Sequence, residues 1–281
     1  MLDLAASIRY RLTMKTPQQL LKNGDVDSEY LLRIACGIST SELLLNFKKP
    51  LTATQLRRFE SFKKKRATGI PIQYIVREAW FFGLNFTVNK KVLIPRPESE
   101  LMVERALEIA AEHSACSIMD LGTGSGAIAI ALAKNCTAPV RALDISLPAL
   151  TVARANAKKH KACVSFSRAD ILKKFPLPKT LHVILTANLP YLSDARMKTL
   201  SEEVLREPKL ALYGGPDGLD LYRTLLRNLS NNKAQTIHAL LEIDPEQKTK
   251  LATFVRREFP KSKLKFYPDL RGDIRLAEIT F

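Results

Sequence analysis

The sequence of 281 residues lacks the features of a membrane protein or a disulfide-stabilised protein. No stretch approaches the roughly 18 consecutive apolar residues that a transmembrane helix needs. No basic segment followed by a long apolar run stands near Met1, so we expect no signal peptide. The four cysteines are widely spaced and form no Cys-x-x-Cys pair, which indicates unpaired thiols in a reducing compartment. We therefore expect a cytoplasmic protein that has no membrane partner.

Acidic residues are few relative to basic ones. The chain has 44 Lys and Arg residues against 28 Asp and Glu residues, which gives a formal net charge of +16. The first 85 residues hold 14 of the basic and 7 of the acidic residues, so the excess is denser there. Such a balance favours nucleic acid, ribosomal or acidic protein partners. Hydrophobic residues at 46% and charged residues at 26% exclude a disordered or fibrous chain.

The first part of the chain shows helix signals and no strand pattern. Thr16-Pro17 is typical of a helix start, and Asp27-Ser28-Glu29 precedes a second apolar segment that Gly37 ends. Thr52 starts a third segment that runs to Gly69, with apolar residues at helical spacing. Residues 1–69 are therefore predicted to form a small helical domain.

Residues 70–97 differ in character, with β-type runs at 73–76, 80–82 and 85–88. Gly83 separates the last two runs, and the stiff segment Ile94–Pro97 ends the region. We predict a β-hairpin linker over 70–97, followed by a third domain over 98–281 whose first helix runs to about His113.

From residue 116 onward, strand and helix patterns alternate, which favours a mainly parallel sheet flanked by helices. The last two strands are joined by only six residues, too few for a parallel crossover, so the final strand should be antiparallel. The predicted strands are 116–120, 139–143, 162–167, 181–187, 236–242, 263–267 and 274–280, and the predicted helices between them are 125–135, 147–160, 217–230 and 246–258.

A glycine-rich loop follows the first of these strands and opens the next helix. Glycines let the backbone approach a ligand, and the helix N-terminus supplies N–H donors. Asp144 ends the second strand, where a carboxylate suits a ribose diol. The loop also fits the loose dinucleotide pattern, so by itself it does not choose a cofactor. The predicted cofactor-binding residues of the loop are Gly122, Thr123, Gly124, Ser125 and Gly126.

Two further residues follow the third strand. Asp170 offers an acceptor for the exocyclic amine of an adenine, and Ile171 offers an apolar contact for its ring. An equally good interpretation makes Asp170 a helix N-cap ahead of Leu172.

The segment Asn188-Leu189-Pro190-Tyr191 ends the fourth strand. In an open α/β sheet, ligands bind beyond the carboxyl ends of the strands, which brings Asn188 beside the glycine loop. Two acceptors, the Asn188 side-chain oxygen and the Leu189 carbonyl, and the ring of Tyr191 suit a planar –NH₂ group. A strand-end turn with a core tyrosine is the alternative interpretation.

Several segments together resemble the HemK/PrmC methyltransferases, over nearly the whole chain. The segments that carry the resemblance are Pro71–Ile75, Val92–Glu100, Asp120–Gly126, Glu207-Pro208, Gly214–Leu219, Leu241–Ile243 with Gln247, and Asp269–Arg275. Ser99 stands where this family usually has Thr.

One departure from the family pattern concerns the acceptor site. The family has Asn-Pro-Pro-Tyr, whereas Leu189 occupies the second position here and keeps only the backbone carbonyl. The form Asn-Leu-Pro-Tyr also resembles ribosomal RNA adenine dimethyltransferases. An RNA or DNA adenine N6-methyltransferase is therefore the alternative function.

The resemblance implies a Rossmann-like, class I S-adenosylmethionine methyltransferase domain of seven strands behind a helical substrate-recognition domain. It implies methyl transfer to the glutamine amide of the Gly-Gly-Gln motif in class I peptide chain release factors, which act in translation termination, with S-adenosylhomocysteine as the product. Asn188, which also borders the cofactor, and Leu189 would accept the two amide N–H groups, with Pro190 and Tyr191 completing the catalytic segment. We expect Asn188→Ala to abolish transfer and to leave cofactor binding nearly intact.

Other functional interpretations find less support. Nothing resembles a hydride-transfer site, and the intact glycine loop argues against a non-catalytic RNA-binding module. The basic run at 57–66 is either a partner surface, for a release factor, RNA or the ribosome, or a solvated helix face. Arg96 is either a contact to the cofactor region or the partner, or a surface or helix-N-terminus contact. The chain's four histidines, His113, His160, His182 and His238, show no metal-ligand spacing, so we predict no metal site.

Overall fold

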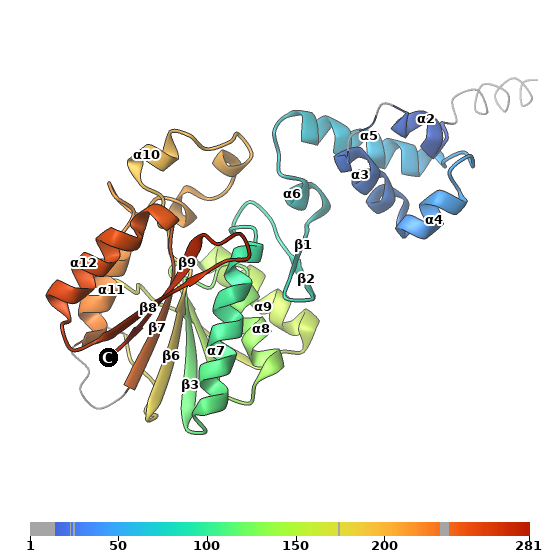
Figure 1. Ribbon diagram of the computed structural model, residues 1–281. Helices are drawn as coiled ribbons and strands as arrows, with labels where there is room; N and C mark the ends of the chain where they lie inside the picture. Colours follow the sequence, from blue (N-terminus) through green and yellow to red (C-terminus); the bar gives the residue numbers. More distant parts are fainter. Residues whose placement is uncertain (1–14, 23, 25, 174, 231–235) are drawn as a thin grey trace, which may run out of the picture. The chain divides into compact units, whose positions relative to one another are not determined.

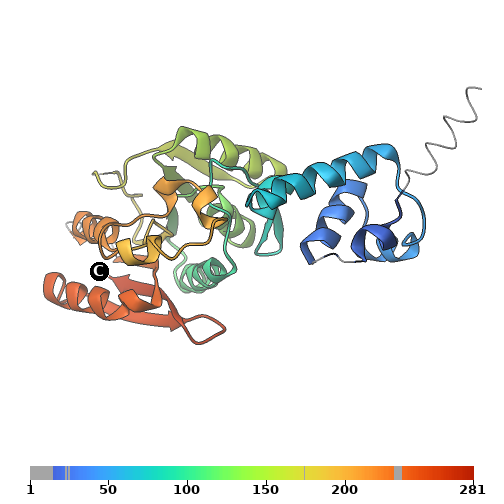
Figure 2. The same ribbon diagram turned by 90° about the horizontal axis from the view of Figure 1, so that it is seen from above.

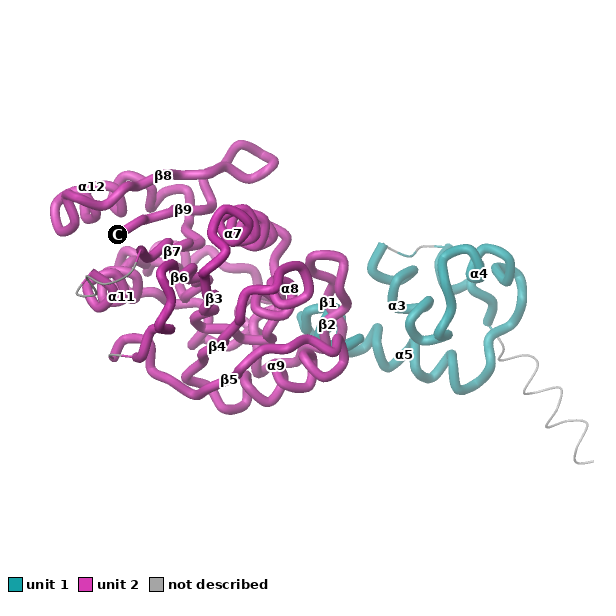
Figure 3. The backbone as a smooth tube through the Cα atoms, turned by 90° about the horizontal axis from the view of Figure 1, so that it is seen from below, with its two compact units in different colours: residues 1–77 teal, residues 78–281 magenta. Residues whose placement is uncertain are grey.

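The computed structural model describes residues 15–281 with the exception of 23, 25, 174 and 231–235 (Figure 1). The first 14 residues of the predicted helical domain therefore lie outside the described residues. The chain has two compact units, residues 1–77 and residues 78–281 (Figure 3).

The first unit is helical throughout its described part. Thr16, Ser39 and Thr52 each cap a helix through a reciprocal capping box, which satisfies two backbone N–H groups at each helix start. Its helices are α2 (Pro17–Leu21), α3 (Val26–Cys36), α4 (Thr40–Leu45), α5 (Ala53–Ala67) and α6 (Ile72–Val76). The sequence pattern does not predict α4, because its six residues are too few for a helical period.

The long helix α5 carries the basic run on a face away from the core of this unit. Phe59 and Phe62 of α5 are buried in that core with Leu31 and Leu32 of α3. Among the basic residues, Lys63 Nζ donates to Ser28 Oγ at 2.5 Å. The apolar stripe of α5 therefore holds the helices together and leaves most of the basic side chains toward solvent.

The prediction of a β-type run at 73–76 is wrong, because this segment is the short helix α6. Pro71 precedes the helix, and its carbonyl accepts the N–H of Tyr74 at 3.0 Å. Ile75 is buried, with Ile72 and Val76 packed beside it in the same core. These positions have the i, i+3, i+4 spacing of a helix face, so packing overrides the strand preference of β-branched residues.

The second unit begins with the predicted hairpin of β1 (Glu78–Phe81) and β2 (Leu84–Thr87). Phe82 and Gly83 form its two-residue turn with φ values of +48° and +70°, the primed turn geometry that matches the strand twist. The Phe82 N–H donates to Glu100 Oε1 at 2.7 Å and so holds the turn against the following helix.

A seven-stranded sheet forms the centre of the second unit, in the order β5-β4-β3-β6-β7-β9-β8. The first five strands of that order are parallel, and β9 runs antiparallel to both of its neighbours. This confirms the predicted α/β fold and its antiparallel last strand. The strands are β3 (Cys116–Leu121), β4 (Val140–Asp144), β5 (Val164–Arg168), β6 (His182–Ala187), β7 (Thr236–Glu242), β8 (Lys263–Pro268) and β9 (Ile274–Thr280).

Helices cover both faces of this sheet (Figure 3). One face carries α7 (Glu100–Glu112), α8 (Ala127–Asn135) and α9 (Leu147–His160), and the other carries α11 (Asp220–Ser230) and α12 (Lys248–Glu258). All six residues of β3 are consequently buried, as in a parallel sheet covered on both sides.

Short elements lie beyond the carboxyl ends of the strands, at the top of the view in Figure 1 and nearest the viewer in Figure 2. These are α10 (Asp194–Met197) and the 3-10 helices η2 (Val204–Arg206) and η3 (Lys209–Ala211). Two further 3-10 turns, η1 (Pro97–Ser99) and η4 (Pro245–Gln247), lead into α7 and α12. None of the helices in the described part of the chain has the length and apolar character needed to cross a membrane.

Candidate active site

The glycine-rich loop connects β3 to α8. Gly122, Gly124 and Gly126 have φ values of +72°, +55° and +82°, in the left-handed region that strains residues with a Cβ. A Cβ on Gly126 would lie 3.1 Å from Ala153 Cβ, whereas one on Gly124 would have only Gly122 O nearby, at 3.9 Å. Gly126 therefore allows α8 to approach α9 closely, and Gly124 leaves open space in front of the loop.

Asp144, the last residue of β4, holds this loop. Its Oδ2 accepts the Gly124 N–H at 2.9 Å, and its Oδ1 accepts the Ser146 N–H at 2.8 Å. The residue is only 8% exposed, and burial raises the pKa of its carboxyl, opposed by these backbone hydrogen bonds. A carboxylate with free lone pairs thus stands at the strand end beside the loop.

Asp170 and Ile171 follow β5 in a turn rather than in a helix. Asp170 Oδ1 accepts the Leu172 N–H at 3.1 Å, and Lys173 Nζ lies 3.9 Å from Asp170 Oδ2. Residues 171–173, directly after Asp170, form a turn and not a helix, so the N-cap interpretation is wrong. The carboxylate remains partly exposed beside the loop.

A cavity of ≈ 230 Å³ lies at the carboxyl ends of β3, β4, β5 and β6. Every predicted site residue lines it except Gly126 and Tyr191. Apolar side chains supply much of the remaining lining, among them Phe81 and Ile128. This is the position at which open α/β sheets bind their ligands.

Asn188 enters the cavity with a fixed side-chain orientation. Its Nδ2 donates to Ser99 Oγ at 2.9 Å, and Ser99 Oγ donates to Glu242 Oε2 at 2.5 Å. Because Ser99 occupies the amide nitrogen, Asn188 Oδ1 is left as the acceptor. Tyr191 OH donates to the other oxygen, Glu242 Oε1, at 3.0 Å.

Glu242 connects the two ends of this hydrogen-bond chain. It is 2% exposed, and burial raises the pKa of its carboxyl, opposed by the hydrogen bonds from Ser99 and Tyr191. Burial and the neighbouring Glu242 also raise the pKa of the Tyr191 hydroxyl well above its usual value, so that hydroxyl stays protonated. Asn188 and Tyr191 are therefore tied to one buried carboxyl group.

The glycine turn at 214–218 packs against the backbone of Tyr191. Gln247 Nε2 donates to Tyr191 O at 2.7 Å and to Asp217 O at 3.1 Å. A Cβ on Gly218 would lie 2.0 Å from Tyr191 O, so only glycine fits there. The turn and Gln247 thus hold the backbone of Tyr191 in position.

Arg96 also lines the cavity, where its guanidinium pairs with the carboxylate of Glu207. Glu207 is buried, and its Oε2 accepts the Ile94 N–H at 2.9 Å. The contact of Arg96 is thus with a buried carboxylate beside the cavity, and not only with the surface.

Comparison with known proteins identifies the family. Residues 18–76 match the PrmC N-terminal domain, and residues 118–208 match a methyltransferase domain. A release factor glutamine methyltransferase of Bacillus subtilis (strain 168) is 35% identical over 254 residues, which cover 88% of each chain. One from Moorella thermoacetica is 42% identical over 204 residues, covering 72% of this chain and 71% of that one.

The chain belongs to the release factor glutamine methyltransferase family. This confirms the resemblance found in the sequence. Among solved structures, the hMettl16 catalytic domain in complex with MAT2A 3'UTR hairpin 6 has a TM-score of 0.54 and 16% identity. It covers 70% of this chain and 75% of that one, and the likeness shows the methyltransferase fold alone.

Ser99 and Glu242, for which no sequence pattern predicts a role, belong to the hydrogen-bond chain that holds Asn188 and Tyr191. Ser99 and Glu242 were only parts of matching segments, 143 positions apart in the chain. In the sequence, each is a polar residue beside apolar ones. Glu242 ends the strand β7, and Ser99 precedes the helix α7.

Proposed function

We propose that this chain transfers a methyl group from S-adenosylmethionine to the side-chain amide nitrogen of the glutamine in the Gly-Gly-Gln motif of class I peptide chain release factors. One observation supports it most: Ser99 fixes the amide of Asn188 so that its oxygen is the acceptor in the cavity. The names of the family members similar to this chain support the same substrate.

The residues present fit the cofactor. Asp144 has carboxylate lone pairs for a ribose diol, and Gly124 leaves space for it beside the N-terminus of α8. Asp170 and Ile171 line the same cavity and suit the amine and the ring face of an adenine. When bound, S-adenosylmethionine would supply an electrophilic methyl group, whose bond to sulfur would break as the acceptor nitrogen bonds to the carbon, with S-adenosylhomocysteine as the leaving group.

The acceptor amide nitrogen is a poor nucleophile because its lone pair is delocalised. Asn188 Oδ1 and the Leu189 carbonyl accept hydrogen bonds from its two N–H groups. These hydrogen bonds orient the nitrogen and stabilise the positive charge that develops on it. The substituted nitrogen is then acidic and loses a proton without a strong base. Tyr191 acts chiefly through Glu242, to which its hydroxyl is bound.

The helical unit is proposed to recognise the release factor, and the basic run of α5 to make a secondary contact with RNA or the ribosome. A chain with this substrate works in the cytoplasm. The test measures the affinity of the chain for ribosomes at increasing salt concentration. A steep fall with salt, and a further fall when Arg57 and Arg58 are changed to glutamine, supports that contact. Affinity that does not depend on salt excludes it.

The test is methyl transfer from labelled S-adenosylmethionine to three substrates in parallel: a class I release factor, its Gln→Ala variant and ribosomal RNA. Label on the release factor that is lost in the variant supports the proposal. Label on RNA alone refutes it in favour of adenine N6-methylation. Asn188→Ala should abolish transfer while its cofactor affinity stays close to wild type, and equal loss of both would refute the role of Asn188.

A further inference from the structure

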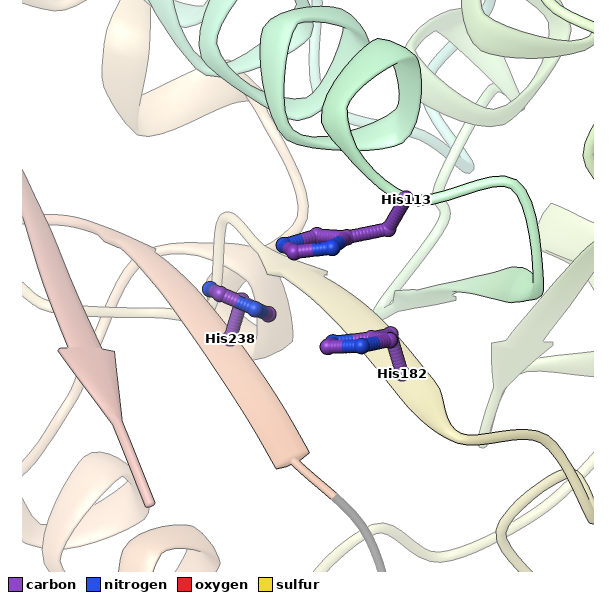
Figure 4. Close-up of side chains that lie close together, drawn as sticks. All are labelled: His113, His182 and His238. Carbon is purple, nitrogen blue, oxygen red and sulfur yellow. The ribbon is translucent and has the colours of Figure 1, made fainter.

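Three histidines gather at the amino ends of β6 and β7, whereas the cavity lies at the carboxyl ends of the strands. Figure 4 shows the three side chains. His182 is the first residue of β6, and His238 lies near the start of β7. These parallel strands are neighbours, and the register pairs His182 with Thr236, which places His182 and His238 on one face. His113 follows the last residue of α7, which packs on that face.

The ring nitrogens are close enough to share one ligand. One nitrogen from each histidine can be chosen so that all three lie within 4.8 Å of one another. The rings of His113 and His182 are stacked with centroids 3.8 Å apart, and His238 lies 5.4 Å from His113 and 6.0 Å from His182. Figure 4 shows the three side chains converging from the helix end and the two strands.

Three ring nitrogens of this cluster lack a hydrogen-bond partner among the described residues. His238 is 9% exposed, and neither of its ring nitrogens has such a partner there; Nδ1 of His182 is likewise buried without one. A buried imidazole that makes no hydrogen bond is costly, and native proteins rarely keep one without a reason. A ligand that accepts ring lone pairs removes that cost.

A carboxylate stands behind the cluster. Glu278 Oε1 lies 3.8 Å from His238 Nδ1, beyond hydrogen-bond distance but within reach of a small ring movement. Glu278 itself is fixed by Arg105 at 2.8 Å and by Tyr267 at 2.5 Å. Histidines that bind a metal commonly donate their second ring N–H to such an oriented carboxylate.

We propose that His113, His182 and His238 bind one divalent transition-metal ion of the Zn²⁺ type. Three neutral imidazoles suit zinc and its neighbours and exclude magnesium and calcium, which prefer oxygen. With Zn–N bonds of about 2.1 Å, tetrahedral ligands lie about 3.4 Å apart, so the rings must draw together and the stacked pair must tilt. The ion would tie the end of α7 to β6 and β7. This inference is independent of the proposed function.

The direct test is titration of the untagged, chelator-treated full-length chain with ZnCl₂, followed by calorimetry and by metal analysis after gel filtration. We expect one ion per chain in the wild type. The melting temperature should rise by roughly 5–10 °C at a free Zn²⁺ concentration one hundred times Kd. Zinc retained no better than in a metal-free control, with no thermal shift, overturns the proposal.

Variants locate the ion. His113→Asn and His182→Asn change partly exposed residues, so the fold should survive, and each should weaken zinc binding by at least about tenfold. His160→Asn is the matched control, because His160 binds Asn85 O at 2.9 Å away from the cluster and should leave zinc affinity unchanged. Undiminished binding in both cluster variants places the ion elsewhere, for example on Cys163, and refutes the site.

Discussion

Replacing Ser99 by alanine tests how the acceptor side chain is held. The hydroxyl accepts from Asn188 Nδ2 at 2.9 Å and donates to Glu242 Oε2 at 2.5 Å, so its removal leaves both groups short of a partner. Ser99 makes no side-chain cap bond to α7, and the start of that helix should therefore be unaffected. Without the hydroxyl, the Asn188 amide can turn over and present its NH₂ group to the substrate.

The magnitude follows from the lost interaction. A buried polar group left without its partner costs about 1–3 kcal/mol, which corresponds to a fall in kcat of about fivefold to 150-fold if the whole cost is present in the transition state. The affinity for S-adenosylmethionine should stay within about threefold, because Ser99 is 3% exposed and its hydroxyl is already bound to Asn188 and Glu242.

The assay is steady-state methyl transfer to a class I release factor, with cofactor affinity measured by calorimetry and folding checked by thermal melting. Ser99→Thr keeps the hydroxyl and serves as the control, with kcat expected near wild type. A Ser99→Ala enzyme with wild-type kcat would refute the orienting role. A loss of cofactor affinity as large as the loss of kcat would refute it equally.

Other parts of the site and its support make separate predictions. Asp144→Asn should weaken S-adenosylmethionine binding by about tenfold to a hundredfold in calorimetry with little change in kcat at saturation, and unchanged affinity contradicts the role of this carboxylate. Gly218→Ala puts a Cβ 2.0 Å from Tyr191 O; it should lower kcat, and it should lower the free energy of unfolding by more than about 2 kcal/mol. Gly272→Ala is the control, because φ is +89° there and nothing lies within 4 Å, so it should lower the free energy of unfolding by only about 1 kcal/mol. Equal losses of stability in the two variants would exclude the steric cause. Burial raises the pKa of Asp120 to about 6 from 3.8, so its stability contribution is present at low pH and is lost as pH rises through 6. In urea unfolding, the free energy of unfolding of the wild type should fall by about 2 kcal/mol relative to that of Asp120→Asn between pH 4 and pH 7. A difference in unfolding free energy that stays constant over this range contradicts the prediction.

The sheet could be predicted from the sequence because its strands are covered on both faces. β3, β6 and β7 are rich in apolar residues and buried at nearly every position, and the short link before β9 forces the antiparallel direction. Prediction failed where elements are one turn long: α6 has β-branched residues, and α10 is too short for any period. Tertiary packing decides such segments, and it is not visible in a local pattern.

The candidate site divides in the same way. The glycine loop, Asp144 and Asp170 each directly follow or end a strand of the predicted parallel sheet, so the order of strands is enough to predict that they line one cavity. The link from Asn188 through Ser99 to Glu242 depends on contacts between distant segments, and no local pattern indicates it. The histidine cluster is similar, since His113, His182 and His238 meet only after α7 packs on two adjacent strands.

Leu189, where the family pattern has proline, illustrates how such contacts compensate for a local change. Leucine brings an N–H that proline lacks, and at 2% exposure that group needs a partner. The buried Tyr222 hydroxyl accepts it at 3.2 Å while donating to Glu242 O at 2.5 Å. The leucine side chain lies against the glycine loop, with Cδ2 2.9 Å from where a Cβ of Gly122 would stand. A hydrogen bond and a packing contact thus hold Leu189 in position, in place of the rigidity of a proline ring.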